Sequence, residues 1–221
     1  MEKGLPVPNK KEGILLLLLS IFFFVGFLGH LLPWTQELMA MLTPWVIGTA
    51  GILCAVFAVK ASGYPLVIWM IIASVVTYFL EVLGVKTGLV FGAYCYGPVL
   101  GVGALGVPYV IGFNWVLVIL GASQLVEGVV KNPIAGAVGA AVIAVVFDFI
   151  LEPVAIHLNY WTWSSGHIPL QNYAAWFVIG FAVALGYYLT PKNGRSAVPG
   201  YYFVIQTGFF LLLRFYLGVV S

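Results

Sequence analysis

Long apolar stretches dominate the sequence, and short polar or proline- and glycine-marked breaks separate them. An α-helix needs about 20 consecutive apolar residues to cross a bilayer core of about 30 Å, since it rises about 1.5 Å per residue. Seven stretches meet this length, so the sequence predicts an all-α, polytopic membrane helix bundle. We expect its spans at residues 13–32, 38–59, 65–83, 108–130, 133–156, 172–189 and 199–220.

The composition supports a membrane location. Only 7% of the 221 residues are charged and 62% are hydrophobic, whereas about 25% of the residues of a soluble domain are charged. We therefore expect a single integral membrane domain over residues 1–221, multi-pass in the cell membrane and surrounded by lipid. The few basic residues form no patch, which argues against a nucleic-acid partner.

Basic residues between the spans predict the orientation of the bundle. If the N-terminus is cytoplasmic, Lys86 is the only one of these basic residues that lies in an outer loop. The positive-inside rule then predicts the N-terminus inside and the C-terminus outside, with Cys95 on the outer side and Cys54 buried near the inner side. The inner side would hold Lys3, Lys10, Lys11, Lys60, Lys131, Lys192 and Arg195.

Two connections, residues 84–107 and 157–171, are long, and both fall on the predicted outer side. The first is too apolar and too rich in glycine for a solvated loop. We expect it to lie on the membrane or dip into it as a cap over the outer ends of the helices.

Two acids lie four residues apart in the fifth span, Asp148 and Glu152. On a helix this spacing places both side chains on one face, one turn apart. Pro153 follows directly and lacks an amide hydrogen, so we expect the helix to kink or open there. Next comes an aromatic cluster suited to a membrane interface or the wall of an apolar pocket: Tyr160, Trp161 and Trp163.

Charged side chains from three spans fall at one depth. Glu81, Asp148 and Arg214 each lie 15 or 16 residues after the proline that begins their span, which is about 22–24 Å along a helix. His30 falls near the same level and Glu152 lies one turn above it. We expect these residues to form a polar belt beneath the outer cap.

Three carboxyl groups and one arginine leave an excess of acid in this belt. Arg214 could simply pair with one carboxylate and hold helices together. Ionisable groups inside membranes, however, usually serve a function, because burying them is costly. An acid that lies in an apolar site beside a second carboxylate favours its neutral form. We therefore expect Asp148 or Glu152 to be protonated at neutral pH and able to donate a proton.

Other functional patterns are weaker. Glu127 lies near the inner end of its span, one turn before Lys131, and is interpreted as a surface ion pair. No two histidines are three or four residues apart, so no metal site is expected. The G-x-G-x-x-G pattern at residues 101–106 lacks the strand and helix of a dinucleotide site and indicates loop flexibility.

Three groups of residues resemble the motifs of one protein family. The first is Glu81, Gly84, Thr87, Gly88, Phe91, Gly92, Tyr94 and Tyr96, followed by Gly106, Val107 and Pro108. The second is Asp148, Glu152, Pro153, Tyr160, Trp161 and Trp163, and the third is Pro169, Asn172 and Trp176. Over about residues 75–180 the chain resembles the integral-membrane carotenoid biosynthesis family, which includes carotenoid 1,2-hydratases and bisanhydrobacterioruberin hydratases.

The resemblance implies a hydratase, a carbon–oxygen lyase that adds water to the terminal C1=C2 double bond of an acyclic carotenoid. Such a reaction needs an acid, a site that tolerates a tertiary carbocation, and one water molecule, but no cofactor. We expect Asp148 to be the general acid, with Glu152 as its partner or as the base and Glu81 as a second candidate base. Other carotenoid-pathway enzymes are candidate partners. The expected substrate-binding residues are Tyr94, Tyr96, Trp161, Trp163, Asn172 and Trp176, with Arg214 as the charge partner.

Two alternatives remain at this point. A carotenoid end-group cyclase would use the same acid, but an internal double bond would capture the cation in place of water. A proton-coupled transporter could use the acids as a proton relay, although it would favour broken helices in two matching halves. The sequence contains one predicted break of this kind, at Pro153, and no internal repeat.

Overall fold

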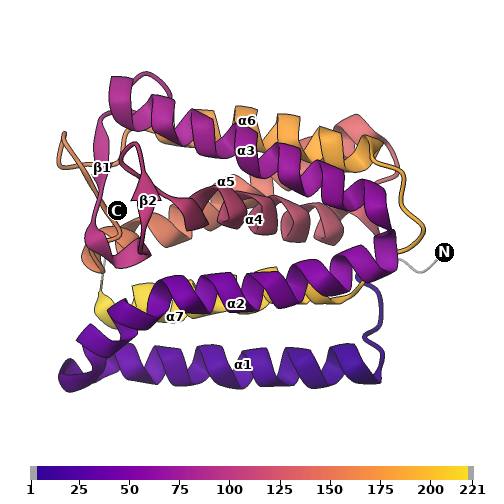
Figure 1. Ribbon diagram of the computed structural model, residues 1–221, viewed down its shortest axis with the longest axis horizontal. Helices are drawn as coiled ribbons and strands as arrows, with labels where there is room; N and C mark the ends of the chain where they lie inside the picture. The colour runs from indigo at the N-terminus through magenta and orange to yellow at the C-terminus, as the bar shows by residue number, and fades with distance from the viewer. Residues whose placement is uncertain (1–3, 219–221) are drawn as a thin grey trace.

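The computed structural model describes residues 4–218 and consists mainly of helices that run along one common direction (Figure 1). Seven of its helices are long and apolar enough to cross a membrane, which confirms the predicted multi-pass bundle. Lys3 and the predicted end of the last span at residue 220 lie outside the described residues. The helices are α1 (Lys10–Leu31), α2 (Gln36–Ser62), α3 (Tyr64–Thr87), α4 (Tyr109–Glu127), α5 (Pro133–His157), α6 (Leu170–Leu189) and α7 (Val198–Leu217).

Helix α4 lies at the centre of the bundle and is its most buried span, whereas α1 is the least buried. Helix α4 packs against α2, α3, α5, α6 and α7, and α1 packs at the edge against α7 and α2 (Figure 1). Small residues allow close approach between α5 and its neighbours. Ala137, Ala140, Ala141 and Ala144 are completely buried, as expected for a packing surface.

The two ends of the bundle differ in charge and in structure. Lys60 in the last turn of α2 and the loops that hold Lys131 and Lys192 lie at the end where α1 begins, because successive helices alternate in direction. Lys86 lies in the last turn of α3 at the opposite end. This distribution agrees with the predicted orientation, which itself stays a prediction.

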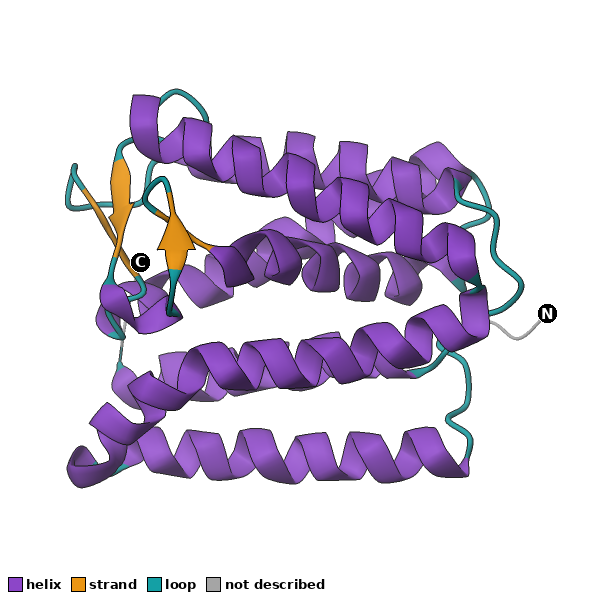
Figure 2. Cartoon of the chain, in the orientation of Figure 1, coloured by secondary structure: helices purple, strands orange, loops and turns teal. Residues whose placement is uncertain are grey.

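The connections at the Lys86 end contain short strands that the sequence did not predict (Figure 2). Strand β1 (Tyr94–Tyr96) pairs antiparallel with β4 (Trp161–Trp163), and β2 (Gly103–Ala104) pairs with β3 (Val107–Pro108). Two 3₁₀ turns, η1 (Pro33–Thr35) and η2 (Pro98–Leu100), complete the elements. The expected glycine-rich cap therefore covers helix ends as a folded ribbon, which is paired to the second long connection.

Helix α5 does not open at Pro153 but continues to His157, and the alternative that the sequence predicted, a kink at this residue, stays a prediction. Because proline has no amide hydrogen, the carbonyl of Phe149 loses its partner within the helix. The Arg214 guanidinium of α7 donates a hydrogen bond of 2.6 Å to this oxygen and lies over the Phe149 ring. The predicted pairing of Arg214 with a carboxyl group stays a prediction.

The two cysteines offer a test of the orientation. Cys95 on β1 is exposed, whereas Cys54 on α2 is fully buried. If the strand-bearing end faces outward, a membrane-impermeant maleimide added to intact cells should label the protein. The Cys95→Ser variant should lose this label and Cys54→Ser should keep it. Labelling confined to inside-out vesicles would reverse the orientation.

Candidate active site

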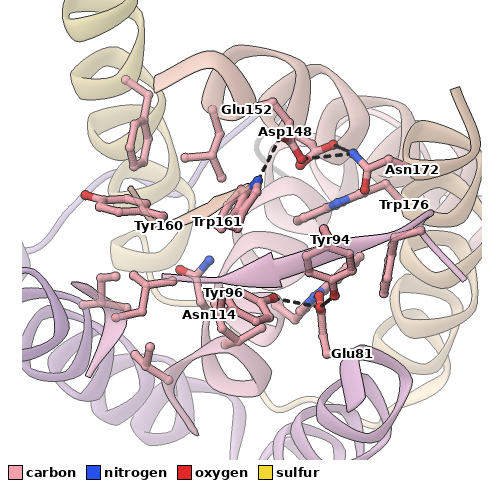
Figure 3. Close-up of a pocket in the computed structure, with 18 of the residues that line it drawn as sticks. Glu81, Tyr94, Tyr96, Asn114, Asp148, Glu152, Tyr160, Trp161, Asn172 and Trp176 are labelled. Carbon is pink, nitrogen blue, oxygen red and sulfur yellow. Dashed lines mark hydrogen bonds between the residues drawn. The ribbon is translucent and has the colours of Figure 1, made fainter. Parts of the chain in front are cut away.

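A cavity of about 60 Å³ lies at the strand-bearing end of the bundle, which is room for a few water molecules. Helices α3 to α7 and strands β1 and β4 all contribute side chains to its wall. The structure thus brings together the nine residues predicted as catalytic or substrate-binding. They are Glu81, Tyr94, Tyr96, Asp148, Glu152, Trp161, Trp163, Asn172 and Trp176, and all of them except Trp163 are labelled in Figure 3.

Asp148 and Glu152 lie on one face of α5, as their spacing predicts, and both are almost completely buried. The Asn172 amide of α6 lies between them. Its nitrogen donates to Asp148 Oδ2 at 2.7 Å and to Glu152 Oε1 at 3.3 Å. The other oxygen of Asp148, Oδ1, is buried and has no hydrogen-bond partner among the described residues.

Glu152 also accepts two hydrogen bonds from strand β4. The indole nitrogens of Trp161 and Trp163 donate to Glu152 Oε2 at 3.0 and 2.9 Å. With Asn172, Glu152 therefore has three donors, whereas Asp148 has one. The indole groups contact an acid inside the protein, so interface anchoring does not account for them.

Glu81 on α3 forms a second buried carboxyl site. Its Oε2 accepts from the hydroxyls of Tyr94 and of Tyr96, the latter at 2.7 Å, and its Oε1 accepts from Trp115 Nε1 at 2.7 Å. Burial and the adjacent Glu81 raise the pKa of both tyrosines, so their hydroxyls stay protonated and keep donating. Three donors hold Glu81, and their hydrogen bonds offset part of the cost of burying its charged form.

The strand pair connects the two carboxyl sites. Tyr94 lies opposite Trp163, and Tyr96 lies opposite Trp161. The two tyrosines of β1 reach Glu81 and the two tryptophans of β4 reach Glu152, so one register supplies four donors to two acids. Figure 3 shows Glu81 on one side of the cavity and the Asp148 and Glu152 pair on the other, with aromatic rings between them.

The aromatic side chains form a continuous wall. Trp115 and Trp176 stack with ring centroids 3.8 Å apart, and Tyr94 lies 5.1 Å from Trp163. The faces of such rings carry negative electrostatic potential, which stabilises a nearby cation. The wall can therefore accommodate a positively charged intermediate without a further carboxylate.

Three uncharged polar side chains of the cavity were missed by the sequence analysis: Asn114, Trp115 and Gln206. These side chains are uncharged, so the pattern of buried charges did not include them. Asn114 and Gln206 are nevertheless amides within apolar spans, and such residues are costly to bury. A search of the spans for uncharged polar groups would have found both.

Glu127 is not among the residues that line the cavity. The sequence predicted an ion pair between Glu127 and Lys131, and this pair does not form. Glu127 contacts Lys192 at 3.4 Å and Arg195 at 3.9 Å, and accepts from the Tyr187 hydroxyl. No group of three or more His, Cys, Asp or Glu residues within residues 4–218 is arranged to hold a metal ion.

Two apolar recesses adjoin the cavity. The larger, of about 860 Å³, lies between α2, η2 and α4 and shares Leu100 and Val110 with the cavity wall. Trp45 and Ile52 on its rim are exposed, so this recess faces the side of the bundle that would contact lipid. The smaller, of about 140 Å³, lies between α1, α2 and α7 and shares Tyr160 and Gln206 with the cavity.

Comparison with known proteins assigns the chain to a family. It is 29% identical over 117 residues to bisanhydrobacterioruberin hydratase of Haloarcula japonica, an alignment covering 49% of this chain and 40% of that protein. The chain thus matches less than half the length of this relative. No solved structure matches it. The profile of the carotenoid biosynthesis proteins matches residues 41–216, most of the chain, and the protein therefore belongs to this family.

Proposed function

We propose that this protein is a cofactor-independent hydratase, which adds water to the terminal C1=C2 double bond of an acyclic carotenoid. The observation that carries the proposal is the unequal hydrogen bonding of the buried carboxyl groups. Glu81 and Glu152 each accept from three donors, whereas Asp148 accepts from one, and its Oδ1 has no partner among the described residues. Asp148 is therefore best suited to hold a proton and to release it.

The reaction begins with transfer of the proton of Asp148 to C2. The two π electrons form the new C–H bond and leave a tertiary carbocation at C1. The aromatic wall stabilises this cation through its ring faces, by about 0.5–2 kcal/mol for each well-placed ring. A lone pair of water then forms the C1–O bond, and the released proton returns to the carboxyl groups of the site. The sum is alkene plus water giving a tertiary alcohol.

The recesses and the relative support the proposed substrate class. A carotenoid is a long apolar chain, and the cavity beside the acids holds only its end. The recess between α2, η2 and α4 adjoins the cavity and faces the lipid side, so it offers the chain a route from the membrane. The relative from Haloarcula japonica is named as a hydratase of bisanhydrobacterioruberin, which supports the same substrate class and reaction here.

A cyclase would use the same acid but would exclude water. Besides Asn172, which binds the two acids, the cavity contains two further amide side chains, Asn114 and Gln206, that ring closure does not need. Their presence favours capture of the cation by water. A proton-coupled transporter would require an acid path through the bundle, whereas the three acids gather at one end.

Replacing the proposed acid tests the assignment. Asp148→Asn keeps the shape and an oxygen that Asn172 can bind, but removes the transferable proton. We expect turnover to fall by at least about 100-fold, in the range of lost general acid catalysis, with a near-normal protein level in membranes. Glu127→Gln is the matched control, because it removes a carboxyl group at the other end of the bundle. Near-normal turnover by Asp148→Asn would disprove the assignment.

Isotope labels identify the reaction itself. Membranes containing the protein are incubated with lycopene or bisanhydrobacterioruberin in ¹⁸O-labelled water, without O₂ or nicotinamide. The product should be a tertiary alcohol with ¹⁸O, and in D₂O it should carry one deuterium on the adjacent carbon. Oxygen from O₂ would indicate a hydroxylase. A deuterated ring product without added oxygen would indicate a cyclase.

Filling the larger recess tests the substrate route. Gly48 on α2 lines this recess, and an added Cβ would meet no atom within 4 Å. Gly48→Phe should therefore fold but lower kcat/KM for the carotenoid by about tenfold or more, since a filled pocket excludes its ligand. Gly13→Phe, at an equally open position on α1, should have no effect. If Gly26→Phe in the smaller recess abolished activity and Gly48→Phe did not, the chain would use the other route.

A further inference from the structure

Two buried acceptor atoms of the cavity have no partner among the described residues, and they come from different walls. One is Asp148 Oδ1 on α5, and the other is Gln206 Oε1 on α7. Both side chains are almost completely buried, with 1% and 4% of their surface exposed. An unpartnered buried polar group destabilises the folded protein, so a ligand that forms hydrogen bonds with these two atoms is favoured in the cavity.

Gln206 belongs to an amide pair. Its nitrogen donates to Asn114 Oδ1 of α4 over 3.5 Å, which is a long and weak bond. The pair lines the cavity on the α4 and α7 side, and Figure 3 draws Asn114 away from Asp148, close to Tyr96. The acid and the amide pair therefore flank the same small space from two sides.

We propose that Gln206, supported by Asn114, binds the water molecule that is added to the carbocation. This inference rests on the hydratase function proposed above. The cavity of about 60 Å³ is large enough for such a water. Water can donate one hydrogen to Gln206 Oε1, which leaves an oxygen lone pair free to attack C1. Asp148 protonates C2 from its own wall, and the water approaches from the amide wall.

Asp148 would act in protonation and Gln206 in capture of the cation, and an assay can distinguish these two steps. Proton transfer from Asp148 does not require Gln206, but capture of the cation does. A cation that meets no positioned water loses a proton from a neighbouring carbon and returns to an alkene. In D₂O this reversal leaves deuterium in the recovered substrate, so exchange reports protonation and alcohol reports capture.

Gln206→Met is the test variant, because methionine has nearly the same length but no strong acceptor. With lycopene or bisanhydrobacterioruberin in D₂O, we expect alcohol formation to fall at least about tenfold while deuterium still enters the recovered substrate. The ratio of exchange to hydration should thus rise at least about tenfold. This ratio does not depend on the amount of folded protein. Gln206→Glu keeps the acceptor oxygen and should restore much of the hydration.

Gln124→Met is the matched control. Gln124 is another fully buried glutamine without a partner among the described residues, and it lies ten residues after Asn114 on α4, about 15 Å away. Its replacement should leave the ratio unchanged. If Gln206→Met reduced exchange and hydration equally, or changed neither, Gln206 would only join α4 to α7 and the inference would be wrong. An unsubstituted protein that neither exchanged nor hydrated would instead refute the hydratase proposal.

Discussion

Three carboxyl groups are buried together at one end of an apolar bundle, and most other features of that end serve to hydrogen-bond them. A carboxyl group removed from water needs donors in its place, because an unsatisfied buried charge costs several kcal/mol. The helices alone supply only Asn172 and Trp115. The remaining donors come from the connections, which fold into the β1–β4 pair for this purpose. A solvated loop in either position would leave Glu81 and Glu152 short of partners.

The donors are distributed unequally, and the proposed chemistry depends on this inequality. Hydrogen bonds to a carboxylate offset part of the cost of its burial, so an acid with one donor is the least stabilised in its charged form. Asp148 therefore differs from Glu81 and Glu152 although all three are aliphatic carboxyl groups. In the proposed reaction the proton is held by Asp148, the acid that the described residues leave least satisfied.

Much of this arrangement could be predicted from the sequence, since charge is conspicuous within apolar spans. Counting from the first prolines placed Glu81 and Asp148 at one depth, and they line one cavity. The strands could not be predicted, because a three-residue strand has no periodic pattern to detect and its register depends on a partner 67 residues away. Gln206 is visible in the sequence as an uncharged polar residue within an apolar span. That its oxygen has no partner among the described residues is a consequence of packing, which the sequence does not contain.

Pro153 and Arg214 explain how the two walls of the cavity stay in register. The proline frees the carbonyl of Phe149, the residue next to Asp148, and Arg214 of α7 binds that oxygen. Arg214 lies eight residues after Gln206 on the same helix, about 12 Å further along. The bond therefore fixes α7, with its amide, against the turn of α5 that carries the acid. In a regular helix the carbonyl of Phe149 would already accept a hydrogen bond from the amide of residue 153. The proline therefore leaves this oxygen to Arg214, and the resulting bond sets the spacing between acid and amide.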